Sequence, residues 1–160
     1  MNDDIVTRYR VLIVDDEPTN LKILANILQD NYDVSAATSG EDALQIAEQM
    51  KPDIILLDLI MPDMNGIEVC EALKAKESTS NIPVIFVTSM SDKVNEIVGF
   101  KAGAADYISK PVVPLIVTAR VKIHLQNHIY VQFLERLLEQ RTQDMETAQQ
   151  EAKLLLQLDY

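Results

Sequence analysis

Five short apolar runs alternate with segments of helical period over the first 110 residues, and this alternation constrains the fold more than any other feature. The runs read RVLIV, DVSAA, DIILL, PVIFVT and ADYIS, at residues 10–14, 33–37, 53–57, 83–88 and 105–109. Short runs of this kind are typical of strands that are covered on both faces of a parallel sheet. Strands that alternate with helices are joined by right-handed crossovers. We therefore predict an α/β fold with a doubly wound, five-stranded parallel sheet in the order 2-1-3-4-5.

The segments between the runs repeat apolar residues at the spacing of a helix that buries one face. The first begins near Pro18, and the second follows Ser39, a typical N-cap residue. The third follows Gly66, and the fourth lies between Ser91 as N-cap and Gly103 as C-terminal stop. The apolar stripes are Leu21, Leu24, Ala25 and Leu28 in the first, Ala43, Ile46, Ala47 and Met50 in the second, and Val94, Ile97 and Val98 in the fourth. These helices complete a flavodoxin-like arrangement.

Length and composition indicate a globular domain with chain left over. The 160 residues, 48% of them hydrophobic, are enough for one ordinary domain with a substantial core. No stretch approaches the roughly 18 consecutive apolar residues of a membrane span, and the N-terminus lacks a signal-peptide pattern. We therefore expect a cytoplasmic protein with no membrane partner. The single cysteine, Cys70, cannot form an internal disulfide, and we expect it to serve as a small apolar residue in a helix.

The charge of the chain is strongly negative and unevenly distributed. The formal net charge is −11, and residues 1–110 hold 19 acidic against 9 basic side chains. Binding to a phosphate backbone needs clustered Lys and Arg residues, which this sequence lacks. We expect no direct binding of nucleic acid.

Chemically reactive side chains follow four of the five predicted strands. Asp15, Asp16 and Glu17 follow the first strand, and Asp58 follows the third. The fourth strand ends at Thr88 and Ser89, and the fifth at Lys110. In a sheet of this order the first and third strands are neighbours at the switch point, where ligands bind beyond the carboxyl ends of the strands. We expect three carboxylates, a hydroxyl and an ammonium to converge there.

Clustered carboxylates indicate a cation. At ~4 Å and an effective dielectric constant near 20, each pair repels by a few kcal/mol. Mg²⁺ binds through one or two carboxylates, waters and a phosphate oxygen, whereas zinc prefers the Cys and His ligands that are missing here. With such an ion and Lys110 to neutralise charge, Asp58 is the best placed aspartate to attack a phosphoryl group. Lys110 and the Thr88 hydroxyl would contact the phosphoryl oxygens.

The stretches VLIVDDEPTN, DIILLDLIMPDMNG, PVIFVTS and GAADYISKP resemble, as an ordered set, the receiver domain of two-component response regulators over residues 9–128. The resemblance implies that Asp58 is the phosphoacceptor. It also implies that Asp15 and Asp16 hold Mg²⁺, with Mn²⁺ as an alternative, together with Asp58 and the backbone carbonyl of Ile60. Thr88 and Lys110 would bind the phosphoryl group. The implied partner is a sensor histidine kinase or a phosphotransfer protein.

The same resemblance assigns a switch and a peptide conformation. Thr88 and Tyr107 match the switch residues of the family, and Lys110-Pro111 matches its cis peptide bond. The sequence departs from the commonest pattern at Ile60 and Met90, two positions beyond Asp58 and Thr88. Both positions influence how long the phosphate lasts in the family.

Two histidines in the last part of the chain have the spacing of a metal site. His124 and His128 are four residues apart in the stretch HLQNH, which lacks the glutamate of a zinc hydrolase motif. A packed or solvated helix face is the favoured interpretation.

The chain from Leu115 to Tyr160 contains neither Gly nor Pro and predicts one helix of about 45 residues, or about 68 Å. Its first turns are expected to pack on the sheet through Val113, Ile116, Val117 and Val121. Apolar residues then recur at alternating steps of three and four, interrupted by Arg141, at Val131, Leu134, Leu138, Met145, Ala148, Ala152 and Leu155. This pattern predicts a parallel two-stranded coiled coil and a homodimer. The alternative is a helix folded back on its own domain.

We accordingly predict a receiver domain at residues 1–128 and a coiled-coil linker at 129–160. Because the chain ends on the apolar KLLLQLDY, we expect it to be a fragment truncated before an output domain. The segment LERLLEQRTQDMETAQQ resembles linkers that precede cyclic-di-GMP enzymes, first HD-GYP phosphodiesterases and then diguanylate cyclases. No catalytic residue of either enzyme is present, so we predict that this chain itself is not an enzyme.

Three other functions are compatible with the architecture. An aspartyl-phosphate phosphatase would often place a general acid two residues after the nucleophile, where this chain has Ile60. A nucleotide- or flavin-binding domain would need a glycine-rich phosphate loop, and neither common motif occurs. A pseudo-receiver that only dimerises would not need the intact acids and lysine.

Overall fold

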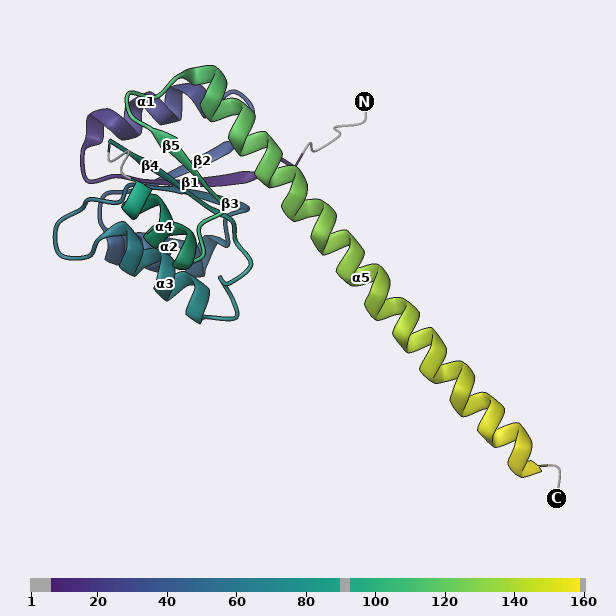
Figure 1. The fold of residues 1–160 in the computed structure, drawn as a ribbon. Coiled ribbons are helices and arrows are strands. Elements are labelled where there is room, and N and C mark those ends of the chain that lie inside the picture. Colours follow the sequence, from purple (N-terminus) through teal and green to yellow (C-terminus); the bar gives the residue numbers. More distant parts are fainter. Residues whose placement is uncertain (1–6, 90–92, 159–160) are drawn as a thin grey trace, which may run out of the picture. The chain divides into compact units, whose positions relative to one another are not determined.

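The structure, a computed structural model, describes residues 7–89 and 93–158, with the backbone alone at 93–95 (Figure 1). The chain divides into two units, Met1–Leu125 and Gln126–Tyr160. The elements in chain order are β1 (Arg10–Val14), α1 (Pro18–Leu28), β2 (Asp33–Ala37), α2 (Gly40–Met50), β3 (Ile54–Leu57), α3 (Gly66–Ala75), β4 (Val84–Thr88), α4 (Lys93–Lys101), β5 (Asp106–Ser109) and α5 (Pro114–Leu158).

The five strands form one parallel sheet in the order β2-β1-β3-β4-β5, which confirms the predicted fold class. All four residues of β3 and all five of β4 are buried, as expected for strands covered on both faces. Helix α1 and the first turns of α5 cover one face, and α2, α3 and α4 the other (Figure 1). The carboxyl ends of β1, β3, β4 and β5 therefore lie along one edge of the sheet.

Local sequence signals explain where the helices begin and end. The Ser39 hydroxyl accepts a hydrogen bond of 3.1 Å from the Asp42 N–H, which confirms Ser39 as the N-cap of α2. Asn65 caps α3 in the same way, through the Glu68 N–H at 2.9 Å. Gly103 follows α4 with φ of 104°, a backbone conformation that glycine adopts readily.

The predicted buried stripe of α4 is wrong. Ile97 is 55% exposed and Val98 is 42% exposed, and the helix instead buries Gly99, while the partly buried Ala102 follows its last residue, Lys101. At 3.6 residues per turn, or about 100° per residue, Val98 lies about 100° and Ile97 about 160° around the helix from Gly99. The predicted N-cap Ser91 and the side chain of Val94 lie outside the described residues.

The predicted contact of α5 with the sheet is correct in part. Val117 and Val121 are fully buried under the sheet, and Leu125 continues the same face one turn later. Val113 and Ile116 are 48% and 45% exposed, because Val113 precedes the helix and Ile116 is turned away from the buried face.

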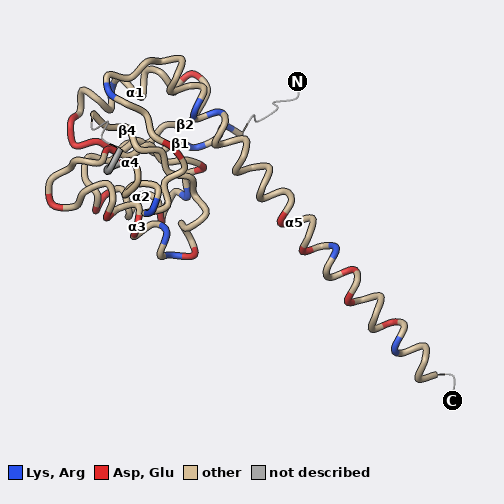
Figure 2. The backbone as a smooth tube through the Cα atoms, in the orientation of Figure 1, with Lys and Arg blue, Asp and Glu red and all other residues tan. Residues whose placement is uncertain are grey.

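The second unit, Gln126–Tyr160, is helical as far as Leu158. Most of its larger apolar side chains are exposed, among them Leu138 and Leu155 at 67% and 66%. Acidic and basic residues are interspersed along it without a long run of one sign (Figure 2). Among the residues that the structure describes, none of the helices combines the length and hydropathy of a membrane span.

Candidate functional site

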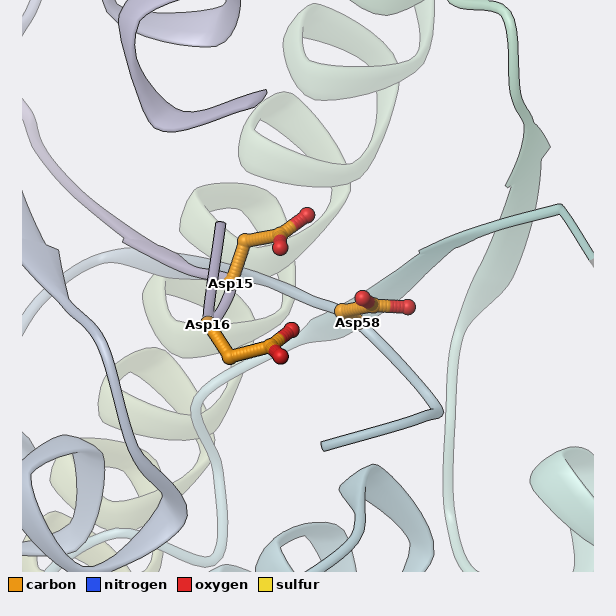
Figure 3. A group of neighbouring side chains, drawn as sticks. All are labelled: Asp15, Asp16 and Asp58. Atoms are coloured by element: carbon orange, nitrogen blue, oxygen red, sulfur yellow. The ribbon is translucent and has the colours of Figure 1, made fainter. Parts of the chain in front are cut away.

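Three aspartates meet at the carboxyl ends of the two central strands (Figure 3). Strand β1 pairs with β3 so that Val14 lies opposite Leu57, and the next residues on each strand are acidic. One oxygen each from Asp15, Asp16 and Asp58 lies within 4.8 Å of the others. Asp15 and Asp58 are buried, whereas Asp16 is exposed. The strand order alone therefore brings together carboxylates that are more than 40 residues apart in the chain.

Lys110 supplies the positive charge in this cluster. Its Nζ atom donates to Asp15 Oδ2 at 2.7 Å and to Asp58 Oδ2 at 3.3 Å, and the side chain is 19% exposed. Its backbone N–H donates to the Thr88 carbonyl at 3.0 Å, which joins the ends of β4 and β5 beside the carboxylates. One lysine thus contacts two of the three clustered carboxylates.

The pKa values of this cluster reflect burial and charge together. Burial raises the pKa of the Asp58 carboxyl, the nearby Lys110 ammonium opposes the rise, and Asp15 adds to it. Burial also lowers the pKa of Lys110, but its contacts with Asp15 and Asp58 outweigh that effect and raise it. The fold therefore disfavours the charged form of Asp58, and a cation bound nearby would stabilise that form.

The loop after Asp58 is built around Gly66. The Gly66 N–H donates to the Leu59 carbonyl at 2.8 Å. A Cβ atom on residue 66 would overlap the Asp58 carbonyl oxygen and lie 2.8 Å from Leu59 Cα. In the sequence, Gly66 marks only the start of the predicted third helix, because the steric need for glycine depends on how closely α3 approaches the end of β3. The Ile60 N–H makes a long contact of 3.4 Å with Asp58 Oδ1.

The two predicted switch residues lie on β4 and β5. Thr88 is buried at the end of β4, opposite Ser109. The Tyr107 ring lies 5.4 Å from the Phe86 ring and 5.5 Å from the Phe100 ring. The Lys110-Pro111 peptide bond is cis, as the resemblance implied.

Several other residues singled out in the sequence contribute no side chain to the three-aspartate cluster. The Glu17 N–H donates to Asp15 Oδ1, and its carboxylate is not one of the three clustered groups. Cys70 is fully buried in α3, as expected for a small apolar residue. His124 bonds to Asp106 Oδ2 at 2.7 Å, which places it on a packed helix face. Met90 lies outside the described residues.

Sequence reasoning did not identify the partner of His124. Asp106 on β5 accepts a hydrogen bond of 2.6 Å from Arg120 as well as the contact with His124 on the next turn of α5. Burial raises the pKa of Asp106, but its bonds to His124, the Tyr107 N–H and Arg120 outweigh that effect and lower it. The spacing of Arg120 and His124 was a signal that one group could contact both.

The donor atoms of the aspartate cluster suit a hard divalent cation. The three groups offer only oxygen, which Mg²⁺ prefers, and two of them are buried with a single lysine to balance them. Among the described residues, no other trio of His, Cys, Asp or Glu side chains is close enough to hold a metal ion. The residues present therefore fit Mg²⁺.

Comparisons with known proteins agree with this geometry. The family model for the response regulator receiver domain matches residues 11–122. The chain is 42% identical over 127 residues to a Vibrio cholerae protein named "Probable cyclic di-GMP phosphodiesterase", covering 79% of this chain and 29% of that one. It is 37% identical over 122 residues to the DNA-binding response regulator MtrA of Mycolicibacterium smegmatis, covering 76% and 52%.

A solved structure shows the same fold. The receiver domain protein of Methanospirillum hungatei, described as CheY-like, superposes with a TM-score of 0.73 at 30% identity, covering 78% of this chain and 98% of that one. The chain thus spans about half or less of the two curated relatives, but nearly all of a receiver domain. From the matched family model and the arrangement of the strands, we conclude that this chain belongs to the response regulator receiver domain family.

Proposed function

We propose that the chain accepts a phosphoryl group on Asp58 from a sensor histidine kinase or a phosphotransfer protein. The observation that carries this proposal is the position of Lys110 Nζ, 2.7 Å from Asp15 and 3.3 Å from Asp58 within a cluster of three carboxylates. A lysine at this position can offset the negative charge of an incoming phosphoryl group. A dimerising scaffold without phosphorylation would not require this arrangement.

In the proposed reaction an Asp58 carboxylate oxygen forms a bond to phosphorus. The bond between phosphorus and a nitrogen of the donor histidine breaks, and its electron pair stays on that nitrogen. Lys110 and the Thr88 hydroxyl contact the phosphoryl oxygens. Asp15, Asp16, Asp58 and the Ile60 carbonyl would hold Mg²⁺, which supplies positive charge at the transferring group when bound.

The phosphoryl group then changes the surroundings of Thr88 and Tyr107. It adds about −1.5 to −2 charge and three acceptor oxygens at the end of β3. The Thr88 hydroxyl is drawn toward these oxygens, and Tyr107 reorients in response. Almost complete switching needs about 5.5 kcal/mol of preference for one state.

Mass spectrometry tests the phosphorylation. The chain is incubated with Mg²⁺ and a small phosphodonor such as acetyl phosphate, and the intact mass is measured. We expect one phosphoryl group on the wild type, none on Asp58→Asn, and one on the control Asp63→Asn, which changes an exposed aspartate of the same loop. Equal labelling of Asp58→Asn and wild type would refute the proposal.

We further propose that α5 forms a parallel homodimeric coiled coil that carries the signal. The apolar residues at alternating steps of three and four are exposed in the second unit, and most of the stability of a helix in proteins comes from packing its apolar face. Cysteines introduced singly between 131 and 155, in a Cys70→Ser background, test the pairing. We expect crosslinks at positions of the seam, with a pattern that changes on adding beryllofluoride as a phosphoryl mimic. Unchanged crosslinks would refute the signalling role.

The output we propose is a cyclic-di-GMP enzyme, with an HD-GYP phosphodiesterase ahead of a diguanylate cyclase, in the cytoplasm. The name of the Vibrio cholerae relative and the linker-like sequence of α5 support this class. Sequencing the gene beyond the codon for Tyr160 tests it. We expect the motifs of one of these two enzymes, and a DNA-binding domain in their place would contradict the proposal.

A further inference from the structure

Gly99 and Tyr107 lie in direct contact across α4 and β5. Gly99 is a buried residue of α4, on the face that covers the sheet. A Cβ atom on residue 99 would overlap the Tyr107 hydroxyl and lie 2.8 Å from Cζ and 2.9 Å from Cε2 of the same ring. The end of the tyrosine ring therefore occupies the space that any other residue at 99 would fill.

The Tyr107 hydroxyl cannot move away from a side chain at residue 99 without movement of the whole ring. The hydroxyl is fixed to a rigid ring, so the oxygen moves only if the whole ring rotates. The ring is also held between Phe86, which is fully buried, and Phe100, the neighbour of Gly99 on α4. A side chain at 99 would therefore displace the ring from both aromatic contacts.

There is room beside the ring for a second position. A hollow of about 420 Å³ adjoins Tyr107 and is lined by residues that include Glu96, Phe100, Ser109 and Ile116. Its walls come from α4, β5 and α5. The ring has space on this side, whereas the Gly99 side is closed to it once residue 99 has a Cβ.

We propose that Gly99 is the positioning residue for Tyr107: the absence of a side chain at 99 is what makes the described position of the ring available. The size of residue 99 then sets the balance between this position and the others open to Tyr107. The inference rests on the proposed function in one respect, the assignment of Tyr107 as a switch residue. The steric claim stands independently of Asp58 phosphorylation.

Fluorine NMR of the chain labelled with 3-fluorotyrosine tests the steric claim. The chain has five tyrosines, and Tyr107→Phe identifies the resonance of Tyr107. We expect Gly99→Ala to shift this resonance and to abolish its response to Mg²⁺ with beryllofluoride, because one ring position is closed. Val98→Ala, an exposed change on the same helix, should leave both unchanged. A Tyr107 resonance in Gly99→Ala that matches the wild type would overturn the inference.

A double-mutant cycle separates this contact from a general effect on α4. Alanine favours a helix over glycine, so without the ring contact Gly99→Ala should raise the thermal midpoint. We expect Gly99→Ala to lower the midpoint in the wild type and to raise it in Tyr107→Leu, which removes the ring. The same change in both backgrounds would overturn the inference. The intact mass of Gly99→Ala after incubation with the phosphodonor shows whether Asp58 is still phosphorylated. This measurement distinguishes a failure of the steric claim from a failure of phosphorylation.

Discussion

Removing the charge of Asp58 should stabilise the fold when Mg²⁺ is absent. The Asp58→Asn change keeps the shape of the side chain and removes one of three carboxylates within 4.8 Å of one another. Two unit charges at that distance repel by about 3.5 kcal/mol at an effective dielectric constant of about 20. On the same basis, the attraction between Asp58 and Lys110, at 3.3 Å, is about 5 kcal/mol. Lys110 also forms an ion pair with Asp15, at 2.7 Å.

The balance is slightly unfavourable for the charged carboxylate. The desolvation of a buried charge and the repulsion from Asp15 together exceed the attraction to Lys110, and this raises the pKa of Asp58. We therefore expect Asp58→Asn to raise the free energy of unfolding by about 1–2 kcal/mol in a chelating buffer at neutral pH.

Urea unfolding measures this difference. The wild type, Asp58→Asn and the control Asp63→Asn are compared with chelator and with saturating MgCl₂. Binding to the native state stabilises it, so we expect Mg²⁺ to raise the stability of the wild type more than that of Asp58→Asn. The control should respond as the wild type does. If Asp58→Asn is no more stable than the wild type in chelator, the electrostatic account of the cluster is refuted.

Three further perturbations test other parts of the account. Gly66→Ala should lower the free energy of unfolding by about 1–3 kcal/mol and slow phosphorylation, because its Cβ meets the Asp58 backbone rather than a flexible side chain; denaturation and acetyl phosphate kinetics measure both. Asp106→Asn should lower the free energy of unfolding by about 1–2 kcal/mol at neutral pH, because it weakens the contacts with Arg120 and His124. Because the pKa of Asp106 is lowered in the folded state, the charged carboxylate stabilises the fold above the unfolded pKa of about 3.9. This stabilisation is lost as the pH falls through the folded pKa, so the free energies of unfolding of mutant and wild type, measured by urea titration, should converge in acid. Arg141→Leu should tighten the dimer about tenfold or more by placing an apolar residue in the seam, and an unchanged dissociation constant in sedimentation equilibrium would contradict the predicted register.

The sheet could be predicted from the sequence because its central strands are covered on both faces. The runs at 54–57 and 84–88 contain no charged residue, and their burial is complete. Once the strand order is known, the meeting of Asp15, Asp16 and Asp58 follows from the pairing of Val14 with Leu57. The site was predictable because it depends on topology and not on the details of packing.

The errors and omissions all concern how helices sit against the sheet. Ile97 and Val98 have a suitable spacing, but the buried face of α4 contains Gly99, which hydrophobicity patterns do not mark. The contacts of Gly66 with the Asp58 carbonyl and of Asp106 with His124 depend on the approach of distant backbone segments. A periodic pattern identifies which residues share a helix face, but not how closely that face approaches its neighbour.

A crystal structure of the chain grown with Mg²⁺ and beryllofluoride would test the central claim most directly. The account predicts beryllium bonded to an Asp58 carboxylate oxygen, with Lys110 and Thr88 in contact with the fluorides. It also predicts Mg²⁺ about 2.0–2.1 Å from oxygens of Asp16 and Asp58 and of the Ile60 carbonyl, with Asp15 in its coordination sphere directly or through water. Beryllofluoride on another residue, or Mg²⁺ bound away from these aspartates, would contradict it.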